Sequence, residues 1–197
     1  MLINKARIAV IWTSLEAALV TATNFLISVV LARMLVPEDF GTVAILGVFV
    51  SLANLFVNAG LGMALVQRQD ITHADESTVF WFNLIAALIM MLILIAGAPW
   101  IAGYFDTPIL ENLTIVLAAN VALSSLGTTQ GTLFTKRLDF KSPMKIGVVS
   151  ALLAGGVGIL MAWNNFGVWA LAGQIISSTL FSVALLWCIS PWRPLMV

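Results

Sequence analysis

Glu16 is the residue whose place in the sequence points most directly to chemistry. It lies well inside an apolar run that extends from residue 8 to residue 35. A charge at such a depth costs about 2.5–3.5 kcal/mol on insertion scales, so intramembrane carboxylates usually face a bundle interior and serve ion or substrate pathways. Two interpretations stay open: a functional group in an ion or substrate pathway, or a structural carboxylate hydrogen-bonded to a neighbouring helix. The same side of this predicted helix carries Thr13, Thr23 and Asn24.

A second apolar run, 41–66, contains small and polar residues one helical turn apart. At about 100° per residue they fall in one narrow stripe. A lipid-facing helix has no use for asparagine, so the stripe faces other helices, through close packing and cross-helix hydrogen bonds, or it forms a cavity wall. Both interpretations stay open. The stripe consists of Gly47, Ser51, Asn54, Asn58 and Gly62, of which the two asparagines are the cavity candidates.

The run 109–134 is polar on two sides, which predicts a helix at the centre of the bundle. One side carries Asn120, Ser124, Gly127 and Gly131, and the other carries Glu111, Thr114, Ser125 and Thr129. Asn120 is the cavity candidate of this run. The next run, 145–163, instead contains small residues at every fourth position, which favours close helix packing.

The elements that position these residues are membrane helices. Hydrophobic residues make up 61% of the 197 residues and charged residues only 9%, against about 25% charged residues in soluble domains. About 20 apolar residues cross a hydrocarbon core about 30 Å thick. The sequence therefore predicts an all-α membrane protein with six transmembrane helices. The predicted spans are 8–34, 41–66, 79–99, 109–134, 145–163 and 167–189.

The basic residues predict the orientation of these spans. If the N-terminus lies inside, Arg33 alone among the nine Lys and Arg residues falls on the outer side. Cytoplasmic loops carry the excess of Lys and Arg in membrane proteins, so both termini are predicted to be cytoplasmic. Arg33 then lies at the end of the first helix in an outer hairpin. Its charge suits the carbonyl-rich C-terminal end of that helix.

Other classes of function find no support in the sequence. Nine basic residues balance nine acidic ones, which gives no case for nucleic-acid binding. The chain has one cysteine and one histidine, and it has no paired-histidine metal motif, phosphate-binding loop or nucleophile elbow. We therefore expect no metal, no cofactor and no enzymatic activity.

Four segments in order resemble one known family. They are "LARMLVPEDFGTVAI" (31–45), "NAGLGMALVQRQDIT" (58–72), "ESTVFWFNL" (76–84) and "GTLFTKRLDFK" (131–141). Their sequences are similar to those of bacterial polysaccharide flippases of the O-antigen type, close to the colanic-acid-exporter branch. These proteins belong to the superfamily that also contains the MATE drug exporters and the lipid II flippase.

The resemblance implies a MATE-like fold of two six-helix lobes around a V-shaped cavity, of which this chain is the N-terminal lobe. It implies alternating access that moves an undecaprenyl-diphosphate-linked oligosaccharide across the bacterial inner membrane, from the inner to the outer leaflet. Such a substrate needs a polar cavity for sugars, cations for the diphosphate and a lipid-open side for its tail. The cationic candidates are Arg33, Arg68 and Arg137, and the ion-coupling candidate is Glu16. For Arg33 two interpretations stay open: it meets the anionic headgroup, or it only stabilises its helix end and reaches toward the interface.

The chain differs from the family in length, because the family's members have twelve or more helices and this chain has six predicted spans. We expect either an N-terminal fragment or a half-size protein, so the partners are the lipid-linked oligosaccharide, membrane lipid, and a missing C-terminal lobe or second protomer. Two other functions stay open. They are an ion-coupled small-molecule exporter of the same superfamily and a non-transporting membrane scaffold for glycan assembly.

Overall fold

Six α-helices make up the part of the chain that the computed structural model describes, and no strand occurs in that part. The described backbone covers residues 2–57, 62, 65, 71–137, 139 and 141–195, and side chains are described within these ranges from residue 17 onward. The helices are α1 (Leu2–Ala32), α2 (Pro37–Val57), α4 (His73–Tyr104), α5 (Ile109–Lys136), α6 (Lys141–Trp163) and α7 (Val168–Ile189). The all-α fold class is therefore confirmed.

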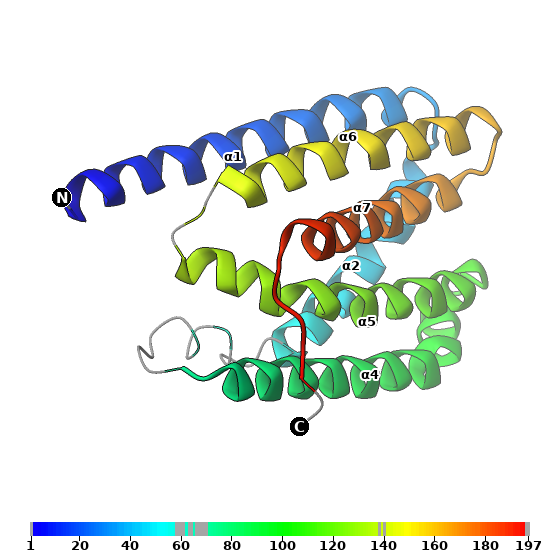
Figure 1. The fold of residues 1–197 in the computed structure, drawn as a ribbon. Coiled ribbons are helices and arrows are strands. Elements are labelled where there is room, and N and C mark those ends of the chain that lie inside the picture. The colour runs from blue at the N-terminus through cyan, green and yellow to red at the C-terminus, as the bar shows by residue number, and fades with distance from the viewer. Residues whose placement is uncertain are drawn as a thin grey trace.

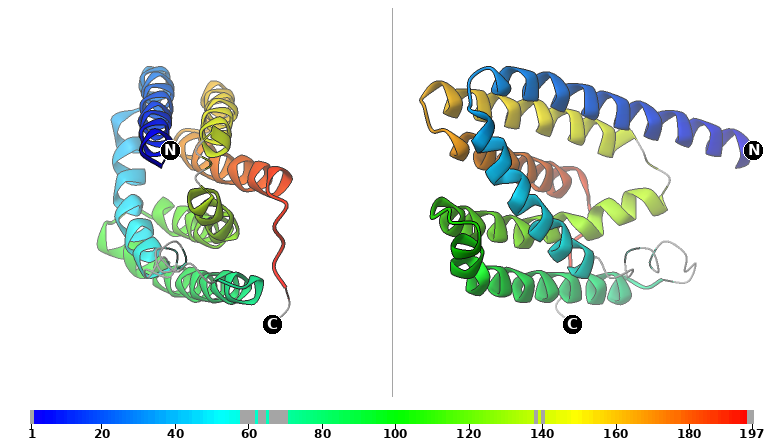
Figure 2. Two further views of the ribbon diagram at one scale, coloured as in Figure 1. Left: turned by 60° about the vertical axis from the view of Figure 1, so that its left-hand side comes forward. Right: turned by 180° about the vertical axis from the view of Figure 1, so that it is seen from behind.

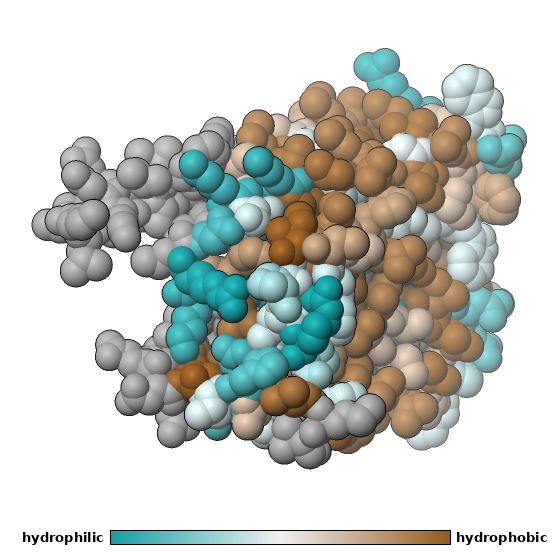
Figure 3. Space-filling model, viewed as in Figure 1, coloured by the Kyte–Doolittle hydropathy of each residue, from teal (hydrophilic) through white to brown (hydrophobic). Residues whose placement is uncertain are grey.

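The helices have the length and composition of membrane spans. Helices α2, α4, α5, α6 and α7 are each long and apolar enough to cross a bilayer, and residues 17–32 of α1 are also apolar. In Figure 3 the broad middle of the molecule is hydrophobic, while hydrophilic residues gather toward its two ends. The chain is a multi-pass membrane protein.

The helices are stacked in a row that a sixth helix crosses. Figure 1 shows α1 beside α6, then α7, then α5 and α4, and each helix packs on the next in that order. Helix α2 runs obliquely across the row and packs on α4, α5 and α7, as the rear view in Figure 2 shows. Helix α7 therefore lies between the α1–α6 pair and the α4–α5 pair.

Small residues bring α1, α6 and α7 close together. A Cβ atom added at Gly155 of α6 would overlap the side chain of Ile27 on α1, and one added at Gly173 of α7 would overlap Met161. On the α7 side of α6, a Cβ atom at Gly158 would lie 3.0 Å from Cβ of Gln174. The packing expected for the small residues of 145–163 is confirmed at Gly155 and Gly158.

The helix ends at one side of the bundle are fixed by side-chain caps. Thr72 and Asp75 form a capping box at the start of α4, in which the Thr72 N–H donates to the Asp75 carboxylate at 3.0 Å. At the start of α6, Asp139 accepts from the backbone N–H groups of Lys141 and Ser142 at 3.1 and 3.2 Å. The Ser142 hydroxyl, at 2.7 Å, is the main reason why the pKa of the Asp139 carboxyl is lowered from its usual value.

Candidate functional site

Two pockets flank α7 and share part of their lining. The first, of about 340 Å³, lies between α7 and the α1–α6 pair, and the second, of about 330 Å³, lies between α7 and α5. Ser178 and Thr179 line both, so we treat the pockets as one feature, the α7 groove. The first is lined by Asn24, Ser28, Ala151, Ala154, Gln174, Ile175, Ser178 and Thr179. The second is lined by Ser124, Gly127, Thr128, Ser178, Thr179, Ser182, Val183 and Leu186.

The polar lining of the α7 groove is uncharged. Gln174, Ser178 and Ser182 follow one another at intervals of four residues, so they lie along one face of α7. The wall on α1 adds Asn24 and Ser28. The groove therefore presents amides and hydroxyls, which can both donate and accept hydrogen bonds.

Some groove hydroxyls are occupied by the helix that carries them. The Ser124 hydroxyl donates to the carbonyl of Val121 at 2.8 Å, and the Thr179 hydroxyl donates to the carbonyl of Ile175 at 3.3 Å. Five other side chains in the lining make no hydrogen bond to the part of the chain that the structure describes. They are Asn24, Ser28, Gln174, Ser178 and Ser182.

These five side chains lie within helices of membrane-spanning character, where lipid tails offer no hydrogen bonds. Polar groups left without partners in hydrocarbon are costly, so irregular or polar surface at membrane depth normally faces protein or water. The α7 groove can therefore hold water or a ligand rich in hydrogen-bonding groups. Among the described residues, no group of three His, Cys, Asp or Glu side chains could bind a metal ion.

Asn24, Thr23 and Asn120 are the sequence candidates that lie in or near the groove. Asn24 lines it, while Thr23 is a half-buried neighbour on α1 that does not line it. Asn120 is 9% exposed on α5, one turn before the groove residue Ser124, and its Oδ1 atom has no hydrogen-bond partner in the described structure.

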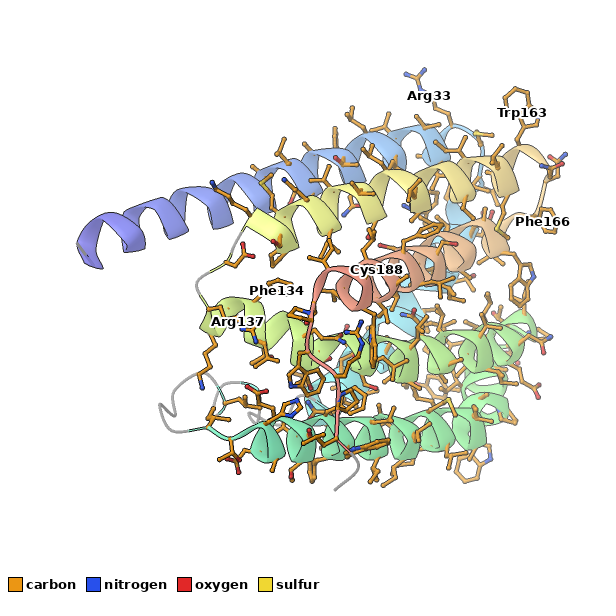
Figure 4. All side chains as sticks on the ribbon, in the orientation of Figure 1. Arg33, Phe134, Arg137, Trp163, Phe166 and Cys188 are labelled. Carbon is orange, nitrogen blue, oxygen red and sulfur yellow. The ribbon has the colours of Figure 1, made fainter. Side chains whose placement is uncertain are left out.

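The cationic candidates lie at opposite ends of the bundle. Arg33 is exposed in the turn between α1 and α2, and in Figure 4 its side chain points away from the helices. Arg137 is exposed at the end of α5, at the other end of the molecule in the same view. The structure therefore does not bring the two arginines together. Arg68 lies outside the described residues.

The stripe of the second run is placed on α2 only in part. Gly47 and Ser51 are exposed, and a Cβ atom at Gly47 would meet nothing within 4 Å. Helix packing within the described bundle therefore does not account for these two positions. Asn54 is half-buried and has an interaction partner. Asn58 lies outside the described residues, as does the side chain of Glu16.

Gln174, Ser178 and Ser182 were not among the residues that the sequence singled out. The signal was present, because the three residues have the same four-residue spacing that marked the stripe in 41–66. Their significance depends on which face of α7 meets α1, α5 and α6, and spacing alone does not give that.

Basic residues lie beyond one end of the α7 groove. Helices α5 and α6 form its two sides. The end of α5, the connection and the first turns of α6 carry a basic rim, which we define as Lys136, Arg137, Lys141 and Lys145. Lys145 precedes the groove residue Ala151 by six residues, which is about 9 Å along a helix axis. The uncharged groove thus has a cationic rim beyond one of its ends.

Comparison with known proteins identifies the family. A family model described as "Polysaccharide biosynthesis protein" matches residues 30–197, which is most of the chain. The chain belongs to the polysaccharide biosynthesis protein family. This membership confirms the resemblance drawn from the four sequence segments. No solved structure gives a significant match.

The relatives of this family member include three polysaccharide proteins. The chain is 30% identical over 183 residues to the succinoglycan biosynthesis transport protein ExoT of Rhizobium meliloti (strain 1021). The matched region covers 93% of this chain and 37% of ExoT. It is 27% identical over 191 residues to the teichuronic acid biosynthesis protein TuaB of Bacillus subtilis (strain 168), and the matched region covers 94% of this chain and 39% of TuaB. It is 25% identical over 146 residues to the lipopolysaccharide biosynthesis protein WzxC of Escherichia coli (strain K12), and the matched region covers 73% of this chain and 29% of WzxC. The chain thus spans two fifths or less of the length of these relatives.

Proposed function

We propose that the chain forms one lobe of a flippase that moves an undecaprenyl-diphosphate-linked oligosaccharide from the inner to the outer leaflet of the bacterial inner membrane. Family membership and the relative named as a succinoglycan transport protein support this activity. The relatives are longer, so the opposite wall of the cavity comes from a second lobe or a second protomer. Flipping breaks no covalent bond, and the proposed protein is a transporter without enzymatic activity.

The observation that carries the proposal is the set of hydrogen-bonding side chains in the α7 groove that have no partner in the described structure. A sugar has many hydroxyl groups, each both a donor and an acceptor. Amide and hydroxyl side chains such as Gln174 and Ser178 match that chemistry. A wall of this kind holds a glycan during transport without a charge that would trap it.

The basic rim supplies the second part of the proposal. Arginine and lysine bind phosphate groups, and Arg137 is exposed on the rim. Cytoplasmic placement of the rim follows the excess of Lys and Arg in cytoplasmic loops and makes both termini cytoplasmic. The diphosphate then docks on the rim while the sugars extend along α7. Glu16 remains the proposed ion-coupling group.

The test is polysaccharide export by the full-length protein in its own bacterium. We expect Gln174→Leu and Ser178→Val each to lower export about fivefold, the effect of one lost hydrogen bond, and to raise the amount of lipid-linked oligosaccharide in the cell. Thr135→Val is the matched control. Its hydroxyl lies outside the groove and donates to the Gly131 carbonyl on its own helix.

Immunoblots of the membrane fraction must show equal amounts of each variant. Normal export by both groove variants would refute the role of the α7 groove. Normal export together with increased sensitivity to toxic small molecules would instead favour an ion-coupled exporter of the same superfamily.

A further inference from the structure

Beyond α7 the chain turns back across the bundle. In Figures 1 and 2 the last described segment, coloured red, leaves the end of α7, passes α5 and reaches α4. We call residues 190–195 the strap. Its far end is fixed on α4, where the Leu195 N–H donates to the Ser77 hydroxyl at 2.9 Å and the Trp81 indole N–H donates to the Leu195 carbonyl at 2.8 Å. Both backbone polar groups of Leu195 are thus held by α4 side chains.

The middle of the strap is anchored by an aromatic side chain. Trp192 is 5% exposed, and its ring lies 5.8 Å from that of Phe80 and 5.9 Å from that of His73, both on α4. Phe80 also lies 6.3 Å from the ring of Trp187 on α7. The strap therefore joins α4 and α7 through a shared aromatic cluster.

The near end of the strap is fixed on α7 by Arg193. Its guanidinium donates to the carbonyls of Ser190, Trp192 and Trp187 at 2.7, 2.7 and 2.8 Å. A cation suits the carbonyl-rich C-terminus of a helix. The guanidinium also lies 5.3 Å from the centre of the Trp187 ring, and the Trp187 indole N–H donates to the Leu126 carbonyl of α5 at 3.1 Å.

The helix that the strap holds is the floor of the α7 groove. Helix α7 packs on α6, α5 and α2, and the strap adds a connection to α4. At the end of the groove nearer the strap, α7 meets α5 so closely that a Cβ atom at Gly127 would lie 3.0 Å from Leu186 and 3.3 Å from Val183. These three residues also line the groove. Any movement of this end of α7 away from α5 widens the groove.

We propose that the strap is a latch that restrains the C-terminal half of α7 against α5 and thereby limits the width of the α7 groove. Its consequence for a ligand rests on the proposed function, whereas the restraint itself does not. Each hydrogen bond between the strap and α4 stabilises the arrangement in which α7 lies against α5, which we call the closed arrangement. Loss of either bond therefore increases the fraction of molecules in which α7 has moved away from α5.

The experiment measures the exposure of the α5–α7 contact without any transport. In the full-length protein, with Cys188→Ser and any other native cysteine replaced, Val183→Cys reports on this contact and is labelled with a water-soluble maleimide. Val183 is 9% exposed in the closed arrangement. Ala87→Cys, at a position that is 0% exposed between α4, α2 and α5, reports on general loosening.

Ser77→Ala and Trp81→Phe each remove one hydrogen bond of the strap. We expect each to raise the labelling rate at position 183 about fivefold, as the loss of one hydrogen bond predicts, and to leave the rate at position 87 unchanged. Thr78→Ala is the matched control, because its hydroxyl donates only to the Ala74 carbonyl of its own helix.

An unchanged labelling rate at position 183 in both strap variants would overturn the proposal. An equal rise at positions 183 and 87 would also overturn it, since the strap would then only stabilise the whole bundle. Export is not measured, so a failed proposed function leaves this result intact.

Discussion

At the scale of single residues, the protein is defined by polar groups inside apolar helices. Gln174, Ser178 and Asn24 keep hydrogen-bonding capacity that no described residue uses. In a membrane protein such groups are costly unless water or a ligand meets them. Their uncharged character separates them from the basic rim, so the proposed function assigns the binding of sugars and the binding of phosphate to different residues.

Asn120 illustrates the difference between a polar group that is buried and one that lines a groove. Its Oδ1 atom is buried without a described partner, so replacing the amide by an apolar group of similar shape removes no hydrogen bond at that atom. We expect Asn120→Leu to leave the thermal unfolding midpoint in detergent unchanged or raised. A decrease of about 2 kcal/mol or more in the free energy of unfolding, the cost of breaking a buried hydrogen bond, would show that the amide has a partner.

Asp139 gives a prediction about pH. Its pKa is lowered in the folded protein, chiefly by the Ser142 hydroxyl. Its charge therefore stabilises the fold above the pKa of an unfolded aspartate, about 3.9, and the stabilisation is lost as pH falls through the lowered value. Asp139→Asn keeps a capping oxygen and removes the charge. We expect its unfolding midpoint to be lower than that of the wild type at about pH 7 and to approach it near about pH 3, where the stabilisation is fading. A difference that persists unchanged at the lower pH would contradict this account.

At the scale of helices, the arrangement rests on close contacts between α1, α6 and α7. These contacts place the α1 wall of the groove, because Ile27 lies against Gly155 of α6 and Asn24 is one turn away on the same helix. A larger residue at this contact would push α1 away from α6. Groove geometry and helix packing are therefore coupled through one pair of residues.

Substitution at this contact has a matched control in the next residue. We expect Gly155→Leu to destabilise the protein by about 1–3 kcal/mol, the usual cost of overpacking, because its Cβ would overlap Ile27. At Gly156 a Cβ atom meets nothing within 4 Å, so Gly156→Leu is expected to be nearly neutral. Adding Ile27→Ala should partly restore the Gly155→Leu variant, as a double-mutant cycle would show. Equal effects at the two glycines would refute the predicted contact.

The helices were predictable from sequence because apolar length is a strong signal for a membrane span. The predicted run 79–99 lies inside α4, which extends further at both ends (His73–Tyr104), since a helix continues past the lipid where its end is capped. Asn24 was predictable from its position inside such a run. The strap was not, because its bonds join Leu195 to residues 118 and 114 positions earlier. No local pattern encodes such a contact.

At the scale of the whole molecule, the basic residues of the described structure other than Arg33 gather toward one end. The basic rim lies at the end where α5 stops and α6 starts, whereas Arg33 and the acidic first turn of α2 lie at the other. Cytoplasmic placement of the rim predicts that Thr135→Cys reacts with an impermeant maleimide only after the inner membrane is opened. Asn165→Cys, in the exposed turn between α6 and α7, should react in intact spheroplasts. The opposite pattern would reverse the proposed orientation.

The central claim is that a glycan lies along α7, and photo-crosslinking in living cells tests it most directly. A benzophenone amino acid is placed at Ser178 in the groove and, as a control, at Leu180, which is 50% exposed on the same helix. Both are introduced into the full-length protein in cells that make the lipid-linked oligosaccharide. The account predicts an adduct that carries glycan at position 178 and at most a trace of it at position 180. Absence of glycan from the adduct at 178, or equal amounts at both positions, would contradict it.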